Sequence, residues 1–129
     1  MINIENQVFN TVANALRSQF TGISVYGEYV ETPSSFPSVS LVEDDNSEPE
    51  NFTSLSREHE TVSDLMYTAN VYSNKTSGKK AQAKDIMDVI DTEMHRMGFI
   101  RTMRNQLPNV DRTIYRITAR YTQRMQIFS

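Results

Sequence analysis

Four arginines near the C-terminus are spaced so that they could bind anions together. Arg112, Arg116, Arg120 and Arg124 recur every fourth residue in a segment that otherwise alternates in character. On a β-strand this spacing places all four on one face, about 13 Å apart. Guanidinium groups form paired hydrogen bonds with carboxylates and phosphates. These four residues, called the arginine stripe below, therefore predict a surface that binds carboxylates or phosphates.

Three interpretations of the arginine stripe are open. It could be the solvated outer face of a sheet, or a charged edge strand. It could bind nucleic-acid phosphates, but the isoelectric point is about 5.3, and Tyr115 and Tyr121 alternate onto the opposite face of the strand. That arrangement disfavours stacking on bases. The stripe could also bind an acidic surface on a second copy of the chain, which is the interpretation we favour.

An acidic segment supplies the complementary charge. Residues 43–60 carry seven acids against Arg57 and follow neither a helical nor a strand period, which predicts a long acidic loop. Such a loop is either a solvated connection or an arm that becomes ordered against a partner. A contact between this segment and the arginine stripe of a neighbour would join unlike surfaces, and such contacts close into rings or grow into filaments. The candidate interface residues are Arg112, Arg116, Arg120, Arg124, Glu43, Asp44, Asp45, Glu48 and Glu50.

The two halves of the chain differ in net charge, with the acidic segment in the negative half and the arginine stripe in the positive half. Residues 1–64 hold eleven acids and two bases, a net charge of −9, whereas residues 65–129 hold five acids and eleven bases, a net charge of +6. Asymmetry of this kind can mark an interaction surface, or it can cancel in space when one compact domain mixes both halves.

Residues for catalysis are scarce. The chain has no cysteine, which excludes thiolate nucleophiles and cysteine-ligated zinc. Its two histidines are His59, in the acidic segment, and His95, four residues after Asp91 on a predicted helix. Two ligands hold a metal poorly, so we interpret Asp91 and His95 as a surface pair. We expect a protein that is not an enzyme and that has no catalytic, cofactor-binding or metal site.

Two amphipathic helices must help to position these charged surfaces. Residues 3–20 repeat apolar residues every fourth position, from Ile4 to Phe20. Residues 77–97 place a second apolar stripe on one face, and Gly98 follows where a left-handed residue commonly ends a helix. An apolar stripe of this kind needs a sheet to cover it.

Five segments read as strands. Residues 23–31 and 38–42 are expected to pair as a hairpin with a longer loop, and the remaining strands are expected at residues 61–73, 99–106 and 112–126. The predicted fold class is α+β, with the order α-β-β-β-α-β-β. We expect a mixed or mostly antiparallel sheet of about five strands with both helices packed on one face.

Length and hydropathy indicate one domain, residues 1–129, without a membrane span. The N-terminal stretch MINIENQVFN has neither a basic region nor an apolar signal core, so we expect a mature, cytosolic N-terminus.

Two stretches carry a resemblance to a known family. VYSNKTSGKKAQAKDIMDVIDTEMHRMGF, with its strand, polar turn, helix and Gly98-Phe99, resembles a recurrent segment of small phage neck and tail-completion proteins. QLPNVDRTIYRITARYTQRM resembles their closing segment, a turn before a strand rich in aromatic residues and arginine. Together with the order of elements along nearly the whole chain, these stretches resemble the tail terminator proteins of long-tailed bacteriophages.

The resemblance implies a structural virion protein. Such a protein forms a hexameric ring that caps the tail tube, ends its polymerisation and offers a docking surface to the head connector. The partners it implies are further copies of the chain, the tail tube protein and a neck or connector protein, with DNA only as cargo passing through the lumen. The location would be the tail or neck of the virion, after assembly in the host cytoplasm. A related neck or head-completion protein, a tail-tube-like subunit and a nucleic-acid-binding module remain as alternatives.

Overall fold

The computed structural model describes residues 3–49, 60–109 and 111–128, which form an α+β fold with two helices and a five-stranded sheet. The strands lie in the order β1-β2-β3-β5-β4; β1 is parallel to β2 and every other pair is antiparallel. The predicted fold class and element order are therefore confirmed. The elements are α1 (Glu5–Gln19), β1 (Ser24–Tyr26), β2 (Ser38–Ser47), β3 (Glu60–Ser73), α2 (Lys79–Arg96), β4 (Ile100–Leu107) and β5 (Tyr115–Phe128).

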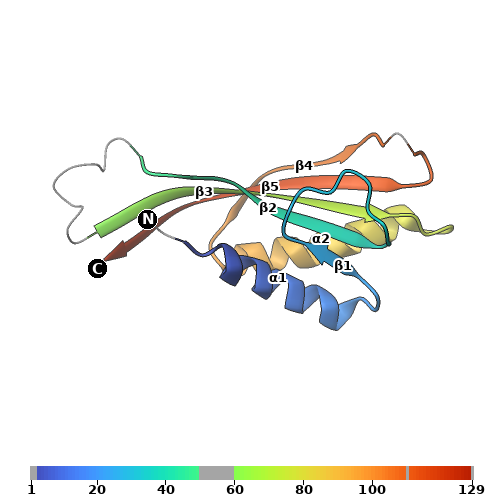
Figure 1. Cartoon of the computed structure of the whole chain (residues 1–129), viewed down its shortest axis with the longest axis horizontal. Coiled ribbons are helices and arrows are strands. Elements are labelled where there is room, and N and C mark those ends of the chain that lie inside the picture. The colour runs from blue at the N-terminus through green and yellow to red at the C-terminus, as the bar shows by residue number, and fades with distance from the viewer. Residues whose placement is uncertain (1–2, 50–59, 110, 129) are drawn as a thin grey trace.

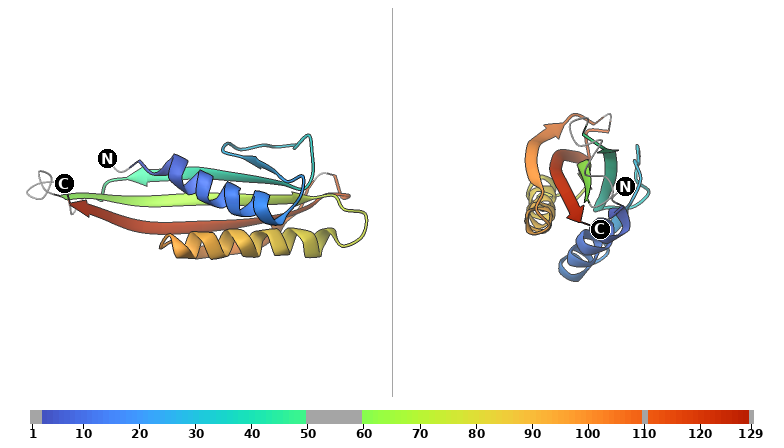
Figure 2. Two further views of the ribbon diagram at one scale, coloured as in Figure 1. Left: turned by 90° about the horizontal axis from the view of Figure 1, so that it is seen from below. Right: turned by 90° about the vertical axis from the view of Figure 1, so that its left-hand side faces the viewer.

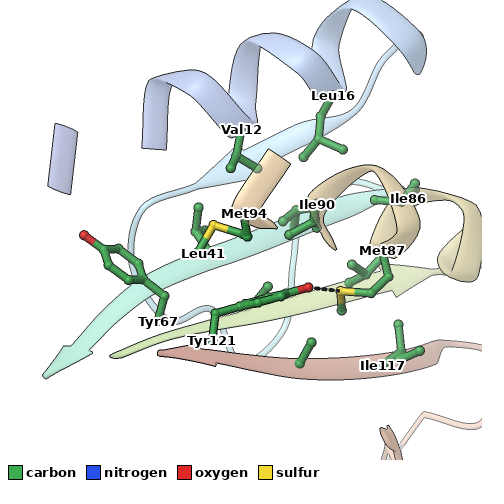
Figure 3. Close-up of a cluster of buried hydrophobic side chains, with 14 of the residues drawn as sticks. Val12, Leu16, Leu41, Tyr67, Ile86, Met87, Ile90, Met94, Ile117 and Tyr121 are labelled. Atoms are coloured by element: carbon green, nitrogen blue, oxygen red, sulfur yellow. Dashed lines mark hydrogen bonds between the residues drawn. The ribbon is translucent and has the colours of Figure 1, made fainter. Parts of the chain in front are cut away.

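Both helices cover the same face of the sheet. Each buries an apolar stripe in one core cluster that also includes Leu41 of β2, Tyr67 of β3 and Tyr121 of β5 (Figure 3). The buried positions of α2 are Ala83, Ile86, Met87, Ile90 and Met94, at the spacing the sequence predicts. β2, β3 and β5 are long and extend past the N-terminal end of α1, as Figure 1 shows. The sheet therefore has one face covered by helices, called the helix face, and an opposite helix-free face.

The short strand β1 differs from the prediction. Residues 23–31 were expected to form an antiparallel hairpin with residues 38–42, but only Ser24–Tyr26 is a strand, and it pairs with β2 in parallel. The reason is the course of residues 27–37, which cross over the helix-free face before the chain re-enters the sheet. The Ser40 hydroxyl donates to the Glu28 carbonyl at 2.8 Å, and the Tyr72 hydroxyl donates to the Val30 carbonyl at 3.0 Å. These bonds hold the crossover in place.

Strand β2 also corrects the predicted acidic loop. It continues to Ser47, so residues 43–47 are part of the sheet, and residues 50–59 lie outside the described residues. The long strand β3 offers pairing partners for this extension, as in the pairs Glu43↔Tyr67 and Asn46↔Leu65. The register shifts between Glu43 and Asp45, which is a β-bulge that leaves Asp44 without a paired residue. Residues 43–47 are all polar, so the sequence has no apolar alternation there that would predict this extension.

Strand β5 begins later than predicted, at Tyr115 rather than at Arg112. The Asp111 carboxylate accepts hydrogen bonds from the backbone amide of Thr113, at 2.9 Å, and from its hydroxyl, at 2.6 Å. These bonds close a local turn that keeps Arg112 out of the ladder. Arg112 is exposed, and its carbonyl oxygen accepts from the Lys79 ammonium at 3.4 Å.

Gly98 ends α2 in the left-handed conformation that the sequence predicts, with φ of +93°. A Cβ atom there would lie 2.7 Å from Nε2 of Gln123, so that side chain would have to move. We expect Gly98→Ala to lower the free energy of unfolding by about 1–2 kcal/mol, because a left-handed conformation is costly for a residue with a Cβ atom. Chemical denaturation measures this change.

Gly27 provides the control for that substitution. Its φ is not positive, and a Cβ atom there would make ordinary contact with the Phe9 ring at 3.5 Å. Gly27→Ala should therefore change stability little. Equal losses for both variants would show that the conformation of Gly98 is not what makes glycine necessary there.

Candidate assembly interface

Three of the four residues of the arginine stripe lie together on the helix-free face. Side chains alternate along β5, so Ile117, Ala119 and Tyr121 are buried under the helices, and the arginines at 116, 120 and 124 point away from them. Arg112 does not join them, because it precedes the strand. β5 pairs with β3 on one side and β4 on the other, so the stripe runs along the middle of the face and is not an edge strand.

Arg116 is held by its own chain. Its Nε and Nη2 atoms donate to Oδ1 of Asn70 at 3.3 and 3.1 Å, and its guanidinium carbon lies 5.6 Å from the centre of the Tyr72 ring. Stacking of this kind stabilises a cation over an aromatic face. Arg116 is half-buried and is held by these contacts. Its charge is therefore less available to a partner than that of an exposed arginine.

Arg124 forms a two-pronged ion pair with Asp64 of β3. Nε donates to Oδ1 at 2.8 Å and Nη2 donates to Oδ2 at 3.0 Å. The hydrogen bond from Arg124 lowers the pKa of the Asp64 carboxyl below its ordinary value. The pair is solvent-exposed, so its contribution to stability is small. It nevertheless neutralises one end of the stripe within a single chain.

Of the three arginines on the helix-free face, Arg120 is the one whose guanidinium has no partner among the described residues. Its side chain is exposed, and no hydrogen bond or ion pair joins its guanidinium to the described part of the chain. It lines an open hollow of about 320 Å³ in the helix-free face, beside Tyr29, Asp44, Met103 and Leu107. Tyr29 is 58% exposed although it is aromatic. A charged side chain without a partner, next to exposed apolar groups, is the composition expected of a protein contact.

The acidic candidates do not form one surface. Asp44, at the bulge, accepts a hydrogen bond from the Thr68 hydroxyl and lines the same hollow as Arg120. Glu43 lies on the helix face, whereas Asp45 and Glu48 are exposed. Glu50 lies outside the described residues. Among the described acids, Asp44, Asp45 and Asp64 lie on the same face as the arginines, whereas Glu43 lies on the other.

Sequence reasoning missed the residues that hold the stripe, namely Asp64, Asn70 and Tyr72. All three lie on β3, at period-two spacing, on the side of the strand that faces away from the core. The alternation of residues 64–72 in the sequence predicts that these three side chains share one face of the strand. The sequence does not show that β3 pairs with β5.

Asp91 and His95 lie in a group of polar contacts between α2 and the sheet. Asp91 accepts from Arg101 at 3.1 Å and from the Tyr121 hydroxyl at 3.2 Å, and it lies 3.2 Å from Nδ1 of His95. These bonds tie α2 to β4 and β5. Burial, and then the Asp91 charge, raise the pKa of Tyr121. Among the described residues no three potential metal ligands gather, and no helix is long and apolar enough to cross a membrane.

Burial makes ionisation of Glu43 costly for the folded state. Burial and the nearby charge of Glu5 raise its pKa, and its Oε1 atom is buried without a hydrogen-bond partner among the described residues. A raised carboxyl pKa means that the folded state holds the proton more tightly than the unfolded state. The stabilising effect is present at low pH and is lost as the pH rises through the folded-state pKa.

Replacing Glu43 by glutamine should therefore stabilise the isolated chain at neutral pH. We expect Glu43→Gln to raise the melting temperature at pH 7 more than at pH 4, in thermal unfolding of dilute protein. Glu28→Gln, at an exposed position, is the control and should have little effect at either pH. A loss of stability at pH 7 for Glu43→Gln would show that the hydrogen bond between the Glu43 carboxylate and Asn46 outweighs the cost of its burial.

Comparison with solved structures finds a protein of similar fold, whereas comparison by sequence finds no match. No family model matches the chain, and no curated protein matches it. Among solved structures, it is similar to the sheath/tube terminator, in the extended state, of the extracellular contractile injection system PVC. The TM-score is 0.51 at 11% sequence identity, over 100% of this chain and 58% of the terminator. The chain thus spans a little over half of that terminator, and at this identity the likeness shows a shared fold.

Proposed function

We propose that this protein is a structural, non-enzymatic tail terminator, which forms a ring on the end of a tail tube and stops its growth. The observation that carries the proposal is the fold shared, over the full length of the chain, with a protein described as a sheath/tube terminator. The order of elements and the two stretches that resemble tail-completion proteins support the same assignment. The particle would be a long-tailed bacteriophage or a related injection system.

The helix-free face is the proposed surface for contact between subunits. It combines the unpaired charge of Arg120 with the exposed Tyr29 and the open hollow between them. Contacts through a surface that differs from its partner surface close into rings when the rotation between subunits permits. A hexamer would leave two ring faces, of which one would meet the tube and the other the head connector, with DNA passing through the lumen.

Tube growth is the test of this proposal. Purified tube protein from the same particle would be allowed to polymerise in the presence and absence of this protein, and tube lengths would be measured by electron microscopy. A terminator should shorten the tubes and appear as a cap at one end. A tail-tube-like subunit would instead enter along the tube, and a neck protein would leave tube length unchanged; either result would overturn the assignment.

A further inference from the structure

A second hollow, on the helix face, lies where α1 begins above β2. Its volume is about 280 Å³ and it is lined by Glu5, Asn6, Phe9, Gly27, Leu41 and Tyr67. We call it the α1 slot. It is separate from the hollow around Arg120, because the sheet lies between the two.

Tyr67 brings an unsatisfied polar group to the α1 slot. The residue is only 1% exposed, yet its hydroxyl has no hydrogen-bond partner among the described residues. In Figure 3 the hydroxyl points away from Tyr121 and from the side chains of α2. Burial, with the charges of Glu43 and Glu5, raises the pKa of this phenol. Buried hydroxyls in proteins nearly always have a partner, so this one is an available hydrogen-bonding group for a ligand or for water.

The negative charge around Tyr67 favours a cationic ligand. Glu43 pairs with Tyr67 across β2 and β3, and its buried oxygen Oε1 also has no partner among the described residues. Glu5, in the first turn of α1, is exposed and close enough to raise the pKa of Glu43. Two carboxylates and a hydroxyl oxygen are acceptors suited to a cation, and Phe9 and Leu41 provide an apolar wall for its alkyl stem.

We propose that the α1 slot binds a guanidinium side chain from a second copy of this chain, and that Arg120 supplies it. This inference rests on the self-assembly in the proposed function and names the two surfaces that meet. Arg120 and the slot lie on opposite faces of the sheet, so the contact forms between copies and not within one chain. Each copy then offers one arginine and one slot, which is the arrangement that a closed ring requires. Figure 2 shows both helices on one side of the sheet, which leaves the helix face and the helix-free face on opposite sides of one chain.

Cross-linking between two singly substituted proteins tests the contact directly. The chain has no cysteine, so Asn6→Cys, in the lining of the α1 slot, and Thr102→Cys, next to Arg120, each introduce a unique thiol at an exposed position and leave Glu5 and Arg120 in place. The two proteins would be mixed and treated with a short bis-maleimide. We expect at least a tenfold higher yield of linked dimer than for Asn6→Cys mixed with Lys84→Cys, which places the second thiol on an exposed position of α2. Equal yields from the two mixtures would overturn the inference.

A charge exchange and the mass of the assembly separate this inference from the proposed function. Arg120→Glu and Glu5→Arg should each weaken self-association, and the double variant should recover it. If the wild type forms rings but cross-linking is unselective, the α1 slot is not the contact, and the proposed ring is still supported. If cross-linking is selective but tubes grow to full length, the contact is supported and the terminator assignment is wrong.

Discussion

Replacing Arg120 by glutamate is expected to weaken self-association at least tenfold without a measurable loss of fold stability. The guanidinium has no partner within the described part of its own chain, so an exposed reversal of charge there should shift the melting temperature little. In an assembly the same change would place a negative charge against Glu5 and Glu43 of the next copy. Tenfold corresponds to about 1.4 kcal/mol, which is modest for a like-charge contact at an interface. Sedimentation equilibrium and thermal unfolding measure the two quantities.

The other arginines of the stripe are matched controls for this prediction. Arg116→Glu removes the bonds to Asn70 and the contact with Tyr72, so it should lower the melting temperature. Arg124→Glu places a carboxylate against Asp64 at an exposed position and should affect self-association less than Arg120→Glu does. If all three reversals weaken association equally, the stripe acts through its overall charge and Arg120 has no special role.

Replacing Ile90 by alanine is expected to lower the free energy of unfolding by about 3 kcal/mol. Ile90 is fully buried at the centre of the α2 stripe, between the sheet and α1 (Figure 3). Truncation removes apolar contacts and leaves a cavity under a helix that the fold cannot easily close. Chemical denaturation of the purified variant measures the loss.

The neighbouring residue Val89 controls for helix propensity. It is only partly buried, so Val89→Ala should cost much less than Ile90→Ala even though both changes introduce alanine in α2. A similar loss at both positions would mean that the sheet and α2 do not pack as described.

The helices and the alternating strands were predictable because their signals are local. The apolar residues of α2 repeat at helical spacing, and apolar residues alternate along β5 from Tyr115 to Tyr121. Each pattern predicts which side of its element faces the core. The parallel pairing of β1 was not predictable, since it depends on bonds from Ser40 and Tyr72 to the crossover at residues 27–37. Tertiary contacts of this kind leave no period in the sequence.

The candidate interface was predictable in part, because the alternation of side chains along β5 is also a local pattern. Alternation correctly placed Arg116, Arg120 and Arg124 on one face, but which of them is paired depends on the register between β5 and β3. That register puts Asp64 beside Arg124 and Asn70 near Arg116, and it leaves Arg120 unpaired within the described residues. Glu43 keeps the regular register with β3 and lies opposite Tyr67, whereas the bulge at Asp44 sets Asp45 opposite Met66 on the other face of the sheet.

The most direct test of the account is the mass of the protein in solution, alone and with purified tail tubes, by native mass spectrometry at low and moderate salt. We predict a closed oligomer, a hexamer, formed by the wild type and lost in Arg120→Glu. Higher salt should weaken the oligomer, because ion pairs at its interface are screened. A chain that stays monomeric under every one of these conditions, with tubes present as well as absent, would contradict head-to-tail self-assembly and the terminator assignment with it.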